Sequence, residues 1–165
     1  MSRIVWGLTI AAVLNYAVLM WYMIFELSPA TGGLKPFDLR IFGYSHEDAM
    51  AYLAVLRFDT AALLTGPIRI IDTSFPILFG AAGAGWIWML SASRGTIVRL
   101  LAVALPIAYT VFDLIENALV GRILLGAMPS VELVSMASTM TMIKFACVGL
   151  SFAAFYFVLD NGDDA

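Results

Sequence analysis

Four long apolar runs, separated by more polar segments, dominate the pattern of hydrophobic and polar positions. Each run supplies the roughly 20 apolar residues that an α-helix needs to cross the hydrocarbon core of a bilayer. They cover about residues 4–25, 67–90, 100–125 and 131–159. The first run is too long for the apolar core of a signal peptide, and no convincing small-x-small cleavage site follows it. We therefore predict four transmembrane helices, the first of them retained.

Residues at the ends of these runs predict where helices begin and how they connect. Gly66 interrupts the helical pattern, and Pro67 suits the first turn of a helix. Ser130 is a suitable N-cap for the fourth helix. The short links 91–99 and 126–130 require neighbouring helices to run antiparallel. The predicted fold is all-α: a single membrane domain, residues 1–165, forming an up-down four-helix bundle. We call the end with the termini side A and the opposite end side B.

Composition agrees with a protein that resides in a lipid bilayer. Hydrophobic residues make up 62% of the chain and charged residues 13%, against about a quarter charged in soluble domains. The net charge of −3 provides no polybasic surface, so we expect no nucleic-acid partner. A lone cysteine, Cys147, can form no internal disulfide, and a lone histidine, His46, argues against a histidine-rich metal site or a bis-histidine haem. We expect no metal and no cofactor.

The positions of aromatic and small residues support the predicted up-down path of the four helices through the membrane. The interfacial aromatic residues are Trp6, Trp86, Trp88 and Tyr156 near side A, and Trp21 and Tyr22 near side B. Such belts are typical of the two membrane–water interfaces. The small residues of the stretch Gly80–Gly85 would let a neighbouring helix approach closely.

The distribution of cations bears on membrane orientation. Side B holds the larger set, Lys35, Arg40, Arg57, Arg69 and Arg122, and side A holds Arg3, Arg94 and Arg99. Most of the side-B cations lie in one long acidic loop, and residues in long loops weigh less than residues flanking the spans. We expect the plasma (inner) membrane of a bacterium, with cytoplasmic termini favoured slightly over the reverse.

The long side-B loop, residues 26–66, is the one substantial extramembrane segment. Ser28–Gly33 has turn chemistry, and from Lys35 to Tyr44 apolar residues alternate with charged ones. Ser45 and Asp48 have the spacing of a capping box, and a helix is predicted from Ala49 to about Leu64. This helix is expected to lie on the membrane surface or cap the bundle. The alternative is a lid over a site that opens to side B.

Polar residues of three helices share a layer near the middle of the bilayer. At 1.5 Å per residue, Asn15, Asp113, Glu116 and Lys144 lie roughly 13–20 Å from side B. Asp72 is shallower, with Arg69 one turn away as an expected ion-pair partner. Ionisable residues at such depths are costly and need partners.

The third predicted helix contains most of this candidate site. Asp113, Glu116 and Asn117 share one helical face, which Tyr109 extends by one turn. Lys144 in the next helix is the expected partner of the two carboxyl groups. The candidate polar site comprises Asn15, Asp72, Tyr109, Asp113, Glu116, Asn117 and Lys144.

Two prolines release backbone acceptors near this layer. Pro76 has no N–H, so the carbonyl of Asp72 four residues earlier loses its helical partner, and Pro106 does the same to Ala102. A released carbonyl is either satisfied by a neighbouring side chain or offered to a ligand.

Three functions are compatible with these patterns. In the first, the polar layer fixes helix pairing, and the protein is an interaction or assembly subunit of a homo-oligomer or larger membrane complex. In the second, it is an intramembrane lipid-binding protein or lipid-acting enzyme that uses Asp113 and Glu116 as acid and base. In the third, it is a proton- or ion-coupled carrier, which the lack of an inverted repeat disfavours. A ligand-sized cavity beside the two carboxyl groups would favour the enzyme.

Overall fold

The computed structural model describes residues 2–126 and 128–160, and this part of the chain is built from helices and connecting turns. In chain order the elements are α1 (Ser2–Tyr22), the π-helical turn η1 (Met23–Leu27), α2 (Ser28–Ala30), the 3₁₀ turn η2 (Phe37–Leu39), α3 (His46–Val55), α4 (Phe58–Thr65), α5 (Pro67–Leu90), α6 (Thr96–Leu125) and α7 (Val131–Asp160).

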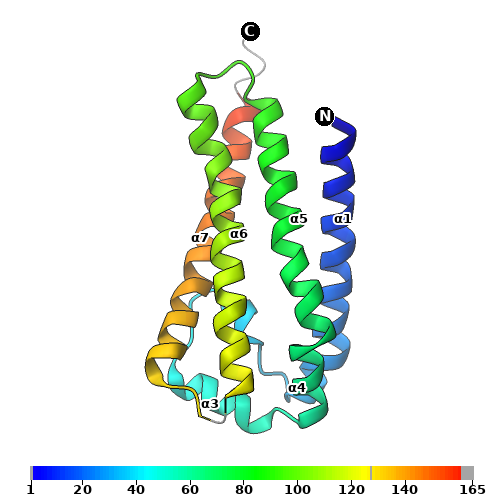
Figure 1. Cartoon of the computed structure of the whole chain (residues 1–165), viewed down its shortest axis with the longest axis vertical. Helices are drawn as coiled ribbons and strands as arrows, with labels where there is room; N and C mark the ends of the chain where they lie inside the picture. Colours follow the sequence, from blue (N-terminus) through cyan, green and yellow to red (C-terminus); the bar gives the residue numbers. More distant parts are fainter. Residues whose placement is uncertain (1, 127, 161–165) are drawn as a thin grey trace.

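Four helical stretches are long and apolar enough to cross a membrane: Ser2–Ala30, Phe58–Leu90, Thr96–Leu125 and Val131–Asp160. They run alternately up and down, so that α1 begins and α7 ends at side A (Figure 1). The predicted all-helical class and the four long helices are confirmed. The predicted start signals also hold, because Pro67 lies in the first turn of α5 and the Ser130 hydroxyl accepts a hydrogen bond from the Leu133 amide.

The long helices pack around α5 and α6. Helix α6 packs against α5 and α7, whereas α1 packs mainly against α5. The close α5–α6 contact depends on Gly80, where an added Cβ would lie 2.8 Å from the Pro106 carbonyl oxygen. Gly85 provides the contact with α1, because a Cβ there would lie 2.8 Å from a methyl group of Val5. The small residues of this stretch therefore allow close helix approach, as predicted.

The segment between α2 and α4, residues 31–57, forms what we call the cap. Its capping box is present: the Ser45 hydroxyl accepts from the Asp48 amide at 3.0 Å, and the Asp48 carboxylate accepts from the Ser45 amide at 2.9 Å. The prediction of one helix from Ala49 to Leu64 is wrong, since Leu56 and Arg57 are extended and separate α3 from α4. The break lets α3 bury Ala49 and Tyr52 while α4 leads into α5.

The cap forms part of the core at side B. Phe37, Tyr44 and Tyr52 are buried, and the Phe37 ring lies 4.9 Å from that of Tyr44 and 5.0 Å from that of Tyr52. Their neighbours in this core include Leu19 of α1, Ile68 of α5 and Ile123 of α6. The inner half of the segment is therefore inserted between the helix ends and does not lie flat over them.

A hydrogen bond attaches the cap to α7. The Ser138 hydroxyl accepts from the Tyr44 amide at 2.8 Å. The preceding residue is Gly43 at φ 81°, where an added Cβ would meet Ser138 and Met142. The turn before Tyr44 thus needs glycine both for its left-handed backbone and for its closeness to α7.

Candidate functional site

Lys144 is the centre of the candidate site. It projects from α7, and its Nζ lies 2.9 Å from Asp113 Oδ1 and is ion-paired with Glu116 Oε2. Glu116 is 0% exposed and Lys144 6% exposed, so both charges are removed from the surface of the bundle. The prediction that Lys144 pairs with a carboxyl group of the preceding helix is confirmed for both residues.

Glu116 has a second partner on α7. Thr141 lies one turn before Lys144 and its hydroxyl donates a hydrogen bond to Glu116 Oε1. The spacing of three residues puts Thr141 and Lys144 on one face of α7, so a single helix holds both carboxylate oxygens of Glu116.

Asp38 of the cap is a member of the site that sequence reasoning missed. It lies in η2, and its Oδ1 is 4.0 Å from Lys144 Nζ, with the side chain 16% exposed. Asp38 is brought inward because its neighbour Phe37 is buried in the side-B core. The only sequence signal was the alternation of apolar and charged residues from Lys35 to Tyr44. We call Asp38, Asp113, Glu116 and Lys144 the acid–lysine cluster.

Asn117 connects this cluster to α5. Its Nδ2 donates to Asp113 Oδ2 at 3.1 Å and to the backbone carbonyl of Asp72 at 3.4 Å. The latter is the carbonyl that Pro76 releases, so the predicted loss of a helical partner is compensated by α6.

Arg69 also reaches α6. Its Nη1 donates to the backbone carbonyl of Asn117 at 2.7 Å, and the guanidinium lies against Gly121, where a Cβ would collide with it. The expected pair between Arg69 and Asp72 is not formed among the described residues, because the guanidinium extends across to α6. Asp72 keeps a carboxylate that makes no hydrogen bond or ion pair within residues 2–126 and 128–160.

The two remaining candidates lie at the edges of the site. Tyr109 is buried one turn from Asp113 toward side A, and its ring packs edge-on against Phe79 at 5.1 Å. Asn15 is separate from the cluster, because its Nδ2 donates to Ser74 Oγ at 2.7 Å and joins α1 to α5. Depth alone placed Asn15 in the layer, but its direction around the α1 axis points it elsewhere.

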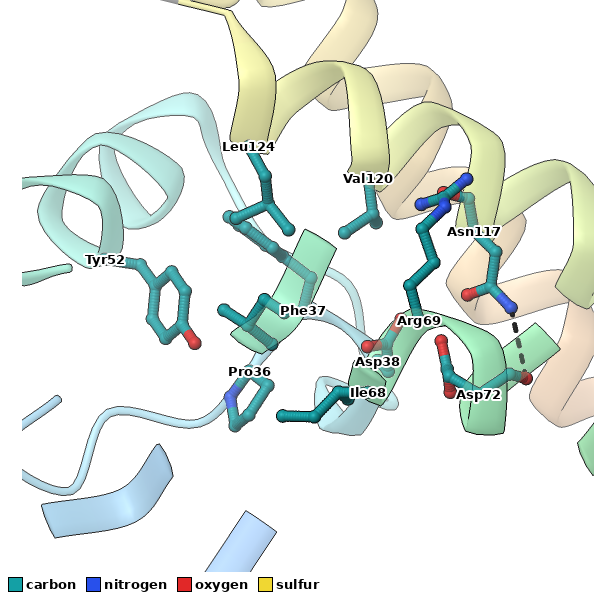
Figure 2. A pocket seen from close by; sticks show the side chains of 11 residues that line it. Pro36, Phe37, Asp38, Tyr52, Ile68, Arg69, Asp72, Asn117, Val120 and Leu124 are labelled. Carbon is teal, nitrogen blue, oxygen red and sulfur yellow. Dashed lines mark hydrogen bonds between the residues drawn. The ribbon is translucent and has the colours of Figure 1, made fainter. Parts of the chain in front are cut away.

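A small cavity lies between the cap, α5 and α6. Its polar lining residues are Asp38, Arg69, Asp72 and Asn117, and Tyr52 and Leu124 are among those that line the rest. Figure 2 shows Tyr52 projecting from α3 toward Phe37, with Arg69 and Asn117 together at the opposite wall. The cavity volume is about 20 Å³, which is room for one water molecule. Asp113 and Glu116, engaged by Lys144, are not among the lining residues.

Comparison with known protein families, curated proteins and solved structures gives no match. The chemistry of the site is therefore inferred from its own geometry.

The site contains more acids than bases. Asp38, Asp72, Asp113 and Glu116 stand against Lys144 and Arg69. This negative charge acts on the two cap tyrosines. Burial, and after it the charge of Asp38, raises the pKa of Tyr52 to about 12. Burial, and after it the charges of Glu116 and Asp38, raises the pKa of Tyr44. No three His, Cys, Asp or Glu residues in the described part of the chain are arranged to hold a metal ion. The arrangement can bind protons or a small cation, and it can hold the cap on the bundle.

Proposed function

We propose that the protein is an integral membrane protein of four transmembrane helices that acts as an interaction or assembly subunit of a membrane complex. The observation that carries this proposal is the set of ion pairs around Lys144, which join α7, α6 and the cap. Buried polar groups that join separate segments fix which elements pair and in what register. The cluster thus acts as a lock that holds the cap in one position.

The cap presents an apolar surface to the outside. Phe42, at the turn of the cap, is 95% exposed, and Ile41 beside it is also exposed. Neither residue belongs to the side-B core. Exposed aromatic side chains on a rigid support are typical anchors of protein interfaces. The lock and this surface together suit a subunit that docks a partner at side B.

A lipid-acting enzyme is less well supported. Its substrate would need room beside Asp113 and Glu116, whose oxygens are occupied by Lys144, Thr141 and Asn117. The neighbouring cavity of about 20 Å³ is far smaller than the roughly 300 Å³ of ordinary ligand pockets. The excess of acids over bases favours a proton- or ion-coupled carrier as the second candidate.

The test uses two variants in a strain that lacks the native gene. The first, Asp113→Asn/Glu116→Gln/Lys144→Met, removes the charges of Lys144 and its two partners on α6 and leaves Asp38, and the second, Phe42→Ser, changes only the outer surface of the cap. An assembly subunit predicts that a folded triple variant still enters the native complex on blue-native gels. Folded Phe42→Ser protein should instead leave the complex. A triple variant that folds and assembles normally but fails to restore growth would end the assembly proposal in favour of a carrier.

A further inference from the structure

The cavity beside the cap contains a buried polar group without a partner. Tyr52 is 0% exposed, its ring points into the cavity, and its hydroxyl makes no hydrogen bond in the described structure. A buried hydroxyl in this condition costs free energy unless a ligand or water satisfies it. Asp38 lines the same cavity, and its Oδ1 is also buried and receives no hydrogen bond.

The charges around the cavity leave at least one carboxylate without a cation. Lys144 lies among Asp38, Asp113 and Glu116, and Arg69 is directed to the Asn117 carbonyl. Among the described residues, Arg40 is a further cation near the cap, and its guanidinium lies 5.6–5.8 Å from the rings of Phe37, Tyr44 and Tyr52. Counting Arg40 still leaves four carboxyl groups facing three cations. An unpaired buried charge is strongly unfavourable, so this carboxyl group either takes up a proton or is met by one more positive charge.

The size and the polar groups of the cavity restrict what can supply this charge. Its volume of about 20 Å³ admits one particle the size of water. Carboxylates and the Tyr52 hydroxyl can all accept hydrogen bonds. The described residues provide no set of three His, Cys, Asp or Glu ligands converging on a metal ion. A cation that donates hydrogen bonds can use these acceptors without such a set of ligands.

We propose that the cavity lined by Asp38, Asp72 and Tyr52 binds one hydrogen-bonding monovalent cation of the size of water, ammonium. The cation donates to the carboxylates of Asp38 and Asp72, and the Tyr52 hydroxyl completes its shell on the cap side. It enters from side B, where the cap and the ends of α5 and α6 form the cavity. The site does not depend on the proposed assembly role, since it concerns how the charge of the interior is balanced.

The experiment measures thermal unfolding of the full-length protein in lipid nanodiscs. Ammonium, sodium, potassium and choline chlorides are compared at equal ionic strength between pH 6 and 8. If ammonium is the ligand, its salt raises Tm above that in choline in a saturable way, as binding to the native state requires. If Tm in choline instead rises as the pH falls from 8 to 6 and ammonium adds nothing, a carboxyl group is neutralised by protonation and the proposal is overturned. The same shifts with sodium or potassium, or none with any cation or pH, would overturn the proposal.

Variants connect the shift to the cavity. Asp72→Asn should abolish the dependence on cation and pH, and it should raise Tm at pH 8 because the unpaired charge is gone. Tyr52→Phe removes only the hydroxyl and should weaken the dependence, which keeps the test decisive if Asp72→Asn fails to fold. Asp59→Asn is the control: Asp59 is an exposed acid paired with Arg57 at 3.3 Å, and its loss should leave the dependence intact. A dependence that survives in both Asp72→Asn and Tyr52→Phe would contradict the site.

Discussion

The side-chain amide of Asn117 on α6 donates a hydrogen bond to the backbone carbonyl of Asp72 on α5 at 3.4 Å. That carbonyl lacks its usual helical partner, because the residue four positions later is Pro76, which has no N–H. The same amide donates to Asp113 at 3.1 Å. One side chain therefore joins an interruption of the α5 hydrogen-bond ladder to the acid–lysine cluster.

This relationship predicts a coupling between Asn117 and Pro76. Asn117→Leu should lower the free energy of unfolding by about 1–3 kcal/mol, the usual cost of leaving a buried acceptor unpaired. In a Pro76→Ala background the restored N–H can bond the Asp72 carbonyl, so the same change should cost less. The measurement is a double-mutant cycle by unfolding in mixed detergent micelles. The hydrogen bond to Asp113 is lost in both backgrounds and cancels, so equal costs would show that the Asp72 bond contributes nothing.

Removing Lys144 alone should lower the stability of the protein more than neutralising Lys144 together with Asp113 and Glu116. Lys144→Met leaves Asp113 and Glu116 buried without a cation, and breaking a buried pair in this way costs about 3–5 kcal/mol. The triple variant Asp113→Asn/Glu116→Gln/Lys144→Met should recover most of that loss, because Asp38 is then the one charge of the acid–lysine cluster that remains. Unfolding in dodecyl maltoside–SDS mixtures compares the two proteins. If the triple variant were the less stable of them, the cluster would contribute net stability through its charges.

The glycines of α5 and α7 should respond in opposite ways to substitution by alanine. At Gly80 a Cβ would lie 2.8 Å from the Pro106 carbonyl oxygen and would collide with Thr110, so Gly80→Ala should destabilise the protein by several kcal/mol. At Gly149 nothing lies within 4 Å, so the better helix propensity of alanine should stabilise by up to about 1 kcal/mol. Thermal unfolding of both variants tests this, and an unaffected Gly80→Ala protein would mean that α5 and α6 are not in close contact.

The attachment of the cap to α7 can be tested without disturbing any charge. Ser138→Ala removes the acceptor of the Tyr44 amide, so exchange of that amide with deuterium should accelerate at least tenfold. Thr139→Ala is the matched control, because the Thr139 hydroxyl is exposed and donates to the Ser135 carbonyl of its own helix. Amide exchange followed by mass spectrometry distinguishes the two. Equal protection of Tyr44 in both variants would refute the anchor.

Alkaline conditions should weaken the cap through Tyr52. Its pKa is raised to about 12 by burial, against about 10 for an unfolded tyrosine. Because the folded pKa is the higher one, the stability that depends on the neutral phenol is intact below pH ~10 and is lost as the pH rises toward ~12. Tyr52→Phe cannot ionise, so its Tm should fall less than that of the wild type across this window. If Tm fell equally with pH in the two proteins, Tyr52 would not remain neutral in the folded protein.

Several features of the molecule could be predicted from the sequence. The four long helices follow from the length of the apolar runs, and Pro67, Ser130 and the Ser45–Asp48 box mark helix starts by local chemistry. The pairing of Lys144 with Asp113 and Glu116 followed from equal depth on adjacent antiparallel helices. All of these depend on distance along the chain or along a helix axis, which the sequence gives directly.

Other features depended on the direction of a side chain around its helix or on the path of a loop. Asn15 has the depth of the cluster but faces Ser74, and Arg69 passes Gly121 to reach α6 rather than pairing with Asp72. Asp38 enters the cluster only because burial of Phe37 pulls η2 between the helix ends. These choices are made by packing between segments far apart in the sequence, where burying an aromatic side chain outweighs the local preference of a charged neighbour for water. Only the tertiary structure decides them.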